Sequence, residues 1–251
     1  MIDFTANTIF VFPHLDDEFT LVPLLKKFNL KKNKNLLLIF CAERFESSMQ
    51  LRLQRRKETF QSLKLLGNSK NQVIFLNDYF DVKDKYLYLS AENIFSFIKD
   101  KSKENKTKQI CTLSFEGGHP DHDALALITK KIGEHINLRT FFFPAYNSRK
   151  TFFLPVSVFR PLKTQLHLFN KYKFRYFCWF PCLLLAFIYK SERRAFLKLL
   201  PFIIFQIIFS KEILYSTNIS ILTVNWEESL SLKRYKISLD DIVNNINKIK
   251  I

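Results

Sequence analysis

Glycine is scarce in this sequence, with 4 residues among 251. It forms no glycine-rich phosphate loop and no dinucleotide fingerprint, so no nucleotide cofactor is predicted. The four cysteines share no spacing typical of a zinc knuckle or a disulfide framework, which fits a reducing compartment. The first residues include an acid and no long apolar core, so we expect no signal peptide and a cytoplasmic location.

Apolar runs long enough to span a membrane are also missing. Residues 177–189 and 196–209 are strongly apolar, but neither run reaches the roughly 20 residues of a spanning helix. We expect both to be buried helices of the C-terminal part. The alternative is a peripheral membrane contact through residues 177–209, because aromatic-rich helices flanked by Lys and Arg suit a bilayer surface.

Positive charge is abundant, and the formal net charge is +16. A basic surface attracts nucleic acid, anionic lipid or phosphorylated substrates. No known nucleic-acid-binding motif organises the basic runs. We therefore expect no specific nucleic-acid partner.

Strand-like and helix-like segments alternate along the first 143 residues. Strands are expected at 8–12, 35–41, 72–76, 86–89, 109–113 and 138–143, and helices at 18–27, 46–67, 91–101 and 121–136. This order predicts an α/β fold, a Rossmann-like three-layer sandwich with a mostly parallel central sheet. Residues 1–150 would form the core. Residues 151–251, with apolar helices and a terminal helix at 240–251, would form a helical, aromatic-rich C-terminal part completing the same domain.

Two polar clusters follow apolar strands of this predicted sheet. The first is Pro13-His14-Leu15-Asp16-Asp17-Glu18, and the second is Gly117-Gly118-His119-Pro120-Asp121-His122-Asp123. Ligands of open α/β sheets bind at the carboxyl ends of the strands, where both clusters would lie. Alone, the first cluster could be a turn rich in helix-capping carboxylates. Together the two offer the imidazole and carboxylate ligands, and the spare carboxylate, that a catalytic metal site needs.

The sequence resembles the PIG-L/LmbE-like zinc-dependent deacetylases, which remove acetyl groups from N-acetylglucosamine-type sugars. Their His-Pro-Asp-Asp-Glu motif corresponds to residues 14–18, with Leu15 in place of the usual proline. Their His-Pro-Asp-His motif corresponds to residues 119–122. An Arg-x-x-Glu helix ending in Leu-Gly corresponds to residues 55–67. The resemblance is clear over about residues 7–145 and is only faint at residues 189–192.

The resemblance implies a role for each motif residue. His14, Asp17 and His122 would bind Zn²⁺, and Asp16 would be the general base. On chemical grounds, zinc and a protonated His119 would stabilise the oxyanion, and either His119 or the protonated Asp16 would pass a proton to the leaving amine. The residues agree with these roles, because two histidines and one carboxylate leave zinc an open position for water.

The remaining acids of the two clusters have weaker assignments. Asp121 and Asp123 would orient a histidine or cap a helix. Glu18 would support the site or the fold.

Substrate contacts are expected from residues outside the two clusters. Arg55 would hold a substrate hydroxyl or phosphate, or else form a surface ion pair near Glu58. Tyr146 and Arg149 follow the last predicted strand, so they would fall at the same edge of the sheet and could line the sugar site. The two other histidines, at positions 135 and 167, are expected to be ordinary surface or packing residues.

The expected function is zinc-dependent deacetylation of an N-acetylglucosamine-type sugar or glycoconjugate. One alternative keeps the chemistry but acts as an amidase on a thiol or aminoglycoside conjugate. The other is a non-catalytic, membrane-associated scaffold that retains the fold. The basic charge and the apolar C-terminal part would suit a phosphate-bearing or lipid-linked substrate.

Overall fold

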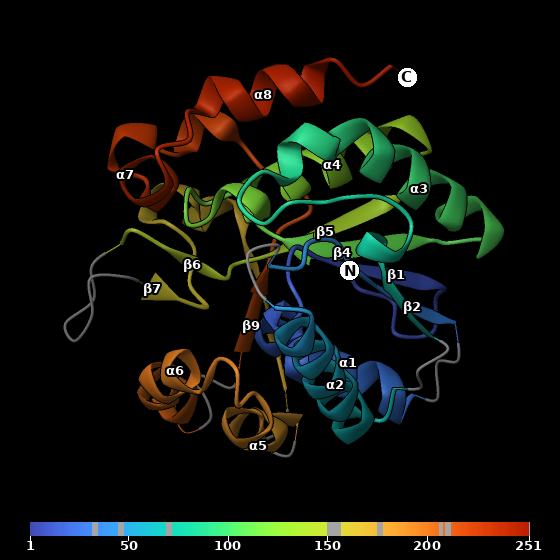
Figure 1. Cartoon of the computed structure of the whole chain (residues 1–251), viewed down its shortest axis with the longest axis vertical. Coiled ribbons are helices and arrows are strands. Elements are labelled where there is room, and N and C mark those ends of the chain that lie inside the picture. The colour runs from blue at the N-terminus through green and yellow to red at the C-terminus, as the bar shows by residue number, and fades with distance from the viewer. Residues whose placement is uncertain are drawn as a thin grey trace.

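A five-stranded parallel sheet with the order β3-β2-β1-β4-β5 lies at the centre of the molecule (Figure 1). The computed structural model describes residues 1–31, 35–44, 48–68, 72–149, 157–174, 178–205, 208 and 212–250. The strands are β1 (Thr8–Phe12), β2 (Leu36–Phe40), β3 (Val73–Phe75), β4 (Gln109–Leu113) and β5 (Arg139–Phe143). The predicted parallel α/β fold is confirmed.

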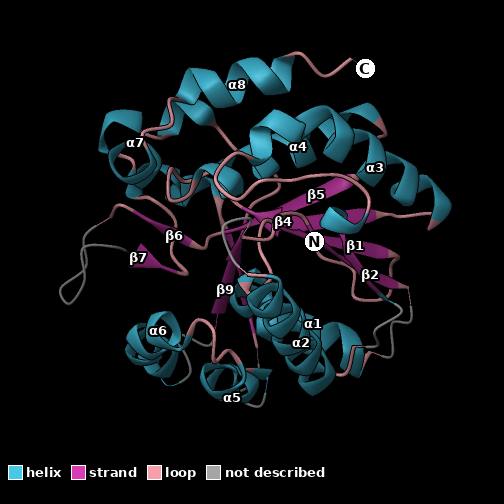
Figure 2. Cartoon of the chain, in the orientation of Figure 1, coloured by secondary structure: helices cyan, strands magenta, loops and turns pink. Residues whose placement is uncertain are grey.

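Helices cover both faces of the sheet, as Figure 2 shows by colour. On one side lie α1 (Val22–Leu30) and α2 (Met49–Leu66); on the other lie α3 (Ala91–Glu104), α4 (Pro120–His135) and, outside them, α8 (Leu239–Asn247). Phe10 and Phe12 pack in the first layer, whereas Ile9 and Val11 pack in the second. Since both faces of β1 are covered, the strand reads as a continuous apolar run.

The direction of chain winding reverses between β1 and β4. The chain first adds β2 and β3 on one side of β1, and then crosses to add β4 and β5 on the other. Phe10 pairs with Cys111, so β1 and β4 are direct neighbours. Loops that leave neighbouring strands in opposite directions open a crevice between them, and both polar clusters lie on such loops.

The C-terminal part joins the same hydrophobic core. Its elements are β6 (Tyr146–Asn147), β7 (Ser157–Val158), β8 (Asn170–Lys173), α5 (Phe180–Ile188), α6 (Arg193–Phe205), β9 (Glu212–Tyr215) and α7 (Leu230–Tyr235). Beyond β9, Ser216 exchanges two backbone hydrogen bonds of 2.8 Å with Phe142 of β5. Trp179, Tyr189 and Phe196 are buried in the same cluster as Phe12. This packing ties residues beyond 150 to the sheet.

The two apolar runs form the helices α5 and α6, but their burial is only partial. Residues 177, 206, 207 and 209 lie outside the described residues. Within the described part, α5 and α6 each bury one side and expose the other. None of the described helices is long and apolar enough to cross a membrane.

Local signals explain where several elements begin and end. Ser48 caps α2 by accepting a hydrogen bond from the Leu51 amide at 3.3 Å, and Gly67 ends it with a φ of +91°. Short 3₁₀ helices occur at η1 (Asp17–Leu21), η3 (Leu76–Asp78), η4 (Leu87–Ser90), η5 (Lys163–Leu168), η8 (Ile221–Thr223) and η9 (Trp226–Glu228). The prediction of a strand at residues 86–89 was wrong, because most of this segment forms the 3₁₀ helix η4. The Leu87 amide donates to the Asp121 carboxylate there.

Replacing Phe10 by alanine is expected to lower the free energy of unfolding by about 3–5 kcal/mol, because its ring is fully buried and packs edge-on against Phe28. Urea unfolding measures the change. Leu222→Ala, at a residue that is 96% exposed, is the control and should stay within about 0.5 kcal/mol. Equal effects of the two changes would contradict the packing described.

Candidate metal centre and active site

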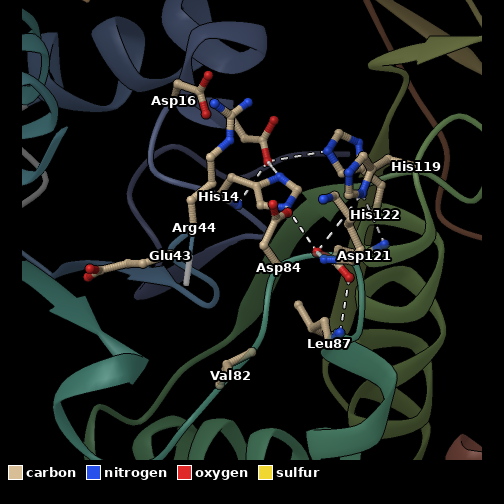
Figure 3. A network of polar contacts seen from close by, with 12 residues as sticks. His14, Asp16, Glu43, Arg44, Val82, Asp84, Leu87, His119, Asp121 and His122 are labelled. Carbon is tan, nitrogen blue, oxygen red and sulfur yellow. Dashed lines mark hydrogen bonds and ion pairs between the residues drawn. The ribbon is translucent and has the colours of Figure 1, made fainter. Parts of the chain in front are cut away.

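The two polar clusters meet where β1 and β4 end (Figure 3). His14 follows β1, and Asp17 opens η1. His119 is the N-cap of α4, and His122 lies in its first turn. One ring nitrogen each of His14, His119 and His122 lies within 4.8 Å of the others. The fold therefore brings together residues more than a hundred positions apart.

Three carboxylates surround the imidazole of His14. Its Nδ1 lies 3.1 Å from Asp17, and its Nε2 lies 3.0 Å from Asp121 and 3.2 Å from Asp84. Burial opposes the charged ring, but these hydrogen bonds and charges outweigh it and raise the pKa of His14 well above 6.5. The three carboxylates therefore concentrate negative charge around the His14 ring.

Asp17 links two histidines through one oxygen. Its Oδ2 lies 3.1 Å from His14 Nδ1 and 3.3 Å from His122 Nε2. Tetrahedral zinc with bonds of about 2.0–2.1 Å separates its ligand atoms by roughly 3.3–3.4 Å. Burial alone would raise the pKa of Asp17, but the two histidines lower it well below 3.8, so the group is a carboxylate. The two measured separations and the donor types fit a zinc-type ion.

His119 lies in a different electrostatic setting. Burial, together with the neighbouring His14 and His122, lowers its pKa well below 6.5, which favours the neutral ring. Its Nδ1 accepts a hydrogen bond from the Asp121 amide at 3.2 Å. The neutral ring therefore carries its proton on Nε2, where it can donate.

Asp121 and Asp123 are buried and hold the loops around the histidines. Asp121 accepts from the Lys85 amide at 2.7 Å and the Leu87 amide at 3.0 Å, besides contacting His14. Asp123 accepts from the amides of Glu116 and Gly117 at 2.8 and 2.9 Å, and from the Ser231 hydroxyl at 2.9 Å. Asp121 thus orients His14, whereas Asp123 shapes the loop that leads to His119.

Asp16 belongs to a separate ionic cluster beside the histidines. Its Oδ1 lies 3.3 Å from Nη2 of Arg55, which is only 6% exposed and also pairs with Glu192. Glu192 in turn lies 3.0 Å from Arg44. Burial disfavours the Arg55 cation, but Asp16 and Glu192 outweigh it and raise its pKa. Arg55 is therefore an internal support of Asp16, and not the surface ion pair considered from the sequence.

Glu18 turns away from the histidines and into the core. It accepts hydrogen bonds from the hydroxyls of Ser62, at 2.6 Å, and Tyr189. Burial raises its pKa to about 8. The Tyr189 hydroxyl also donates to the Leu15 carbonyl at 3.0 Å. Glu18 therefore fixes the turn that carries Asp16 and Asp17.

A cavity of about 1050 Å³ opens over the three histidines. Its apolar walls come largely from Phe19, Phe159, Phe196 and Leu199. Its polar lining includes Asp16, Arg44, Lys85, Arg234, Tyr235 and Glu192. Tyr146 lines the cavity. Arg149 is not among its described lining residues, and it donates to the Pro161 carbonyl at 3.4 Å.

Several of these residues lie far from both motifs and could not be predicted from them. Asp84 sits in a polar loop, and Arg234 and Tyr235 end α7, far from either motif. The ring of Tyr235 lies 4.6 Å from that of His119. Glu192 lies in residues 189–192, and the faint resemblance of this segment to the family was the one sequence signal for it.

A buried carboxylate holds the connection from β5 to β6. Glu116 accepts from the Ala145 amide at 2.9 Å and from the Asn147 side-chain amide at 3.0 Å. Gly118 packs so closely there that a Cβ would lie 1.9 Å from the Tyr146 carbonyl oxygen. Glycine at 118 thus allows the second cluster to contact the segment that carries Tyr146.

Comparison with known proteins identifies the family. Residues 9–132 match the family model described as PIG-L, GlcNAc-PI de-N-acetylase. The chain belongs to the PIG-L family over these residues. No curated protein sequence matches the chain.

Several solved structures share the fold of this PIG-L family member. A deacetylase of the A40926 pseudoaglycone superposes with a TM-score of 0.56 at 15% identity, covering 76% of this chain and 83% of that one. A triple mutant of a deacetylase of the teicoplanin biosynthetic pathway gives 0.53 at 14%, covering 74% and 82%. A conserved protein of Thermus thermophilus gives 0.53 at 13%, covering 88% and 98%. At such identities the likeness concerns the fold.

The PIG-L match ends inside α4, so part of the site lies beyond it. Both clusters fall within residues 9–132. Tyr146, Glu192, Arg234 and Tyr235 come from the C-terminal part. This PIG-L family member therefore takes its two motifs from the matched segment and much of its cavity wall from outside it.

Glu116→Gln should make the loss of stability between about pH 5 and pH 8 less steep. Burial raises the Glu116 pKa from 4.5 to about 8, so the folded protein keeps a proton that the unfolded chain releases. Stability is therefore lost as pH rises through this window, on the order of a few kcal/mol for this group. Urea unfolding at several pH values measures the loss. The exposed control Glu134→Gln should keep the wild-type slope, and a Glu116→Gln slope equal to it would refute the assignment.

Proposed function

We propose that this protein is a zinc-dependent deacetylase of an N-acetylglucosamine-type sugar or glycoconjugate. The observation that carries the proposal is the Asp17 carboxylate, which contacts both His14 and His122 at the floor of a large cavity. The family description, a de-N-acetylase, supports the same reaction. Hydrolysis would release acetate and leave the free amine on the sugar.

His14, Asp17 and His122 are the proposed zinc ligands. A zinc ion there would supply a bound water with a pKa near 7 and an electrophile for the amide carbonyl. Asp121 would orient His14 from its other side, since its Oδ2 lies 3.0 Å from His14 Nε2. Two histidines and one carboxylate would leave the metal accessible from the cavity.

Asp16 is the proposed general base. Its side chain is 26% exposed and lines the cavity, so it can reach a water molecule there. Arg55 fixes one of its oxygens, which leaves the other to accept a proton from the attacking water. Once protonated, Asp16 can return that proton to the leaving amine.

His119 is the proposed oxyanion donor. Its neutral ring has Nδ1 committed to the Asp121 amide, so Nε2–H is the donor that remains. A preorganised donor of this kind stabilises the tetrahedral intermediate by about 3 kcal/mol. Tyr235, whose ring contacts His119, would hold the imidazole in place.

The cavity favours a substrate larger than a free monosaccharide. Its volume of about 1050 Å³ is at the upper end of small-molecule sites. Aromatic walls suit the apolar faces of sugar rings or an acyl chain, while Arg44, Lys85 and Arg234 suit an anionic substituent. Arg55 is occupied by Asp16 and Glu192, and Arg44 also pairs with Glu192, so Lys85 and Arg234 are better placed to receive it.

His14→Ala should abolish stoichiometric zinc binding, because it removes one ligand and leaves Asp17 and His122 with an incomplete site. Metal analysis of the purified protein after dialysis measures the content. His135→Ala, at an exposed histidine of α4, is the matched control and should keep one zinc per chain. Full zinc content in the His14 variant would rule out this ligand set.

Asp16→Asn should reduce acetate release by about a hundredfold or more, because a general base typically contributes that much or more. Zinc content should stay the same, since Asp16 is not a proposed ligand. The assay uses N-acetylglucosamine derivatives with free, nucleotide-linked and lipid-linked anomeric positions, and Asp240→Asn is the exposed control.

The same assay separates the alternatives. Cleavage of thiol or aminoglycoside conjugates without acetate release from N-acetyl sugars would replace deacetylation by the amidase function. A zinc-free protein without turnover on any substrate would indicate a non-catalytic scaffold. If the Asp16 variant kept wild-type turnover, Asp16 would not be the general base.

A further inference from the structure

Helix α5 exposes a stripe of large apolar side chains. Phe180, Leu184 and Phe187 are 55%, 49% and 65% exposed, respectively. Their spacing of four and three residues places them on one side of the helix. Cys182 and Leu185, on the other side, are buried in the core. Half of α5 therefore packs inward while the outer half presents aromatic and aliphatic groups.

Helix α6 continues this surface and adds positive charge. Leu197, Ile204 and Phe205 are exposed, whereas Phe196 and Ile203 are buried. At 100° per residue, the exposed apolar residues fall on the same side as Arg193, Arg194 and Lys198, which are exposed too. The cations lie in the N-terminal half of the helix and the apolar residues mainly in the C-terminal half. We call the exposed residues Phe180, Leu184, Phe187, Arg193, Arg194, Leu197, Lys198, Ile204 and Phe205 the docking face.

Negative charge is nearly absent from this region. Between residues 180 and 205 the sequence has four cations, counting Lys190, and a single acid, Glu192. The carboxylate of Glu192 is turned toward Arg55 and Arg44. The docking face therefore combines apolar side chains with an excess of positive over negative charge in residues 180–205, which is the combination that binds anionic lipid surfaces.

The docking face shares a helix with the wall of the active-site cavity. Ala195, Phe196, Lys198 and Leu199 of α6 line that cavity. In Figure 1, α5 and α6 lie at the end of the molecule opposite α8. A surface that binds the docking face would therefore be brought beside the cavity.

We propose that the docking face binds the surface of an anionic lipid bilayer, with α5 and α6 lying in the interface. The apolar side chains would enter the boundary between headgroups and acyl chains, and Arg193 and Arg194 would contact lipid phosphates. Contact would be peripheral, because none of the described helices could span the bilayer. Resting on the proposed deacetylase function, this placement would set the cavity beside a bilayer that carries a lipid-linked substrate.

A second copy of the chain fits this surface less well. A symmetric dimer brings the same patch of both subunits together. Arg193, Arg194 and Lys198 of the two copies would then approach one another without acids on the face to compensate them. The net charge of +16 adds to that repulsion.

Vesicle flotation of the full chain tests the proposal. The protein should float with vesicles of phosphatidylcholine containing phosphatidylglycerol, and much less with phosphatidylcholine alone or at high salt. Arg193→Glu combined with Arg194→Glu should weaken binding by at least about tenfold, since each cation near an anionic surface contributes to the affinity. Phe187→Asp should also weaken it, by removing an apolar contact.

Matched variants elsewhere provide the controls. Lys103→Glu with Lys108→Glu reverses two exposed charges, and Leu89→Asp alters a leucine that is 62% exposed. These controls should bind as wild type does. Equal losses in the controls, no binding by the wild type, or a stable dimer that the Phe187 variant dissociates would each overturn the proposal.

A further measurement separates this proposal from the proposed function. The Arg193/Arg194 double variant should keep its zinc and its acetate release from a soluble substrate, but lose release from a lipid-linked substrate in vesicles. Vesicle binding without any acetate release would support docking and refute the deacetylase. If the double variant releases acetate from the soluble substrate and also from the lipid-linked substrate in vesicles as fast as the wild type, docking is refuted and the deacetylase function stands.

Discussion

The adjacency of β1 and β4 is the constraint on which the site depends. Their parallel pairing brings the chain after Phe12 beside the chain after Leu113, at the point where the winding of the sheet reverses. Neither motif could form the cluster alone, because the first supplies His14 and Asp17 and the second supplies His119 and His122. Asp121 contacts both sides, through the His14 ring and through the backbone of the loop before η4. A shift in the register of these strands would separate the proposed metal ligands while leaving both motifs intact.

The site also balances its buried charges internally. His14 lies among Asp17, Asp84 and Asp121, and Arg55 lies between Asp16 and Glu192. A buried ion that loses its partner costs several kcal/mol, so each group holds the next in place. His119 is the exception, because burial, together with His14 and His122 beside it, lowers its pKa and favours its neutral form. That difference divides the three histidines into two that can share a cation with Asp17 and one that can donate a hydrogen bond.

The fold and the two motifs could be predicted because they depend on local sequence. Strands that are covered on both faces consist of apolar runs in the sequence. The two histidine-containing motifs follow two such strands. Arg234 and Tyr235 could not be predicted, since only the packing of α7 brings them to His119. The strand expected at residues 86–89 failed because its backbone bonds to Asp121, a partner that no pattern in that segment indicates. The strand β8 is polar and mostly exposed, so its sequence has no alternation of apolar and polar residues from which a strand could be predicted.

The turn between α5 and α6 connects the histidine cluster to the outer surface. Glu192 reaches inward to Arg55, which holds Asp16, while Arg193 and Arg194 are exposed to solvent at the next two positions. Tyr189, just before this turn, donates to Glu18 and to the Leu15 carbonyl in the first motif. The C-terminal part is thus more than a cover over the PIG-L segment, because its side chains fix the turn that carries Asp16 and Asp17. Whatever binds the exposed side of α6 contacts the same element that positions the proposed base.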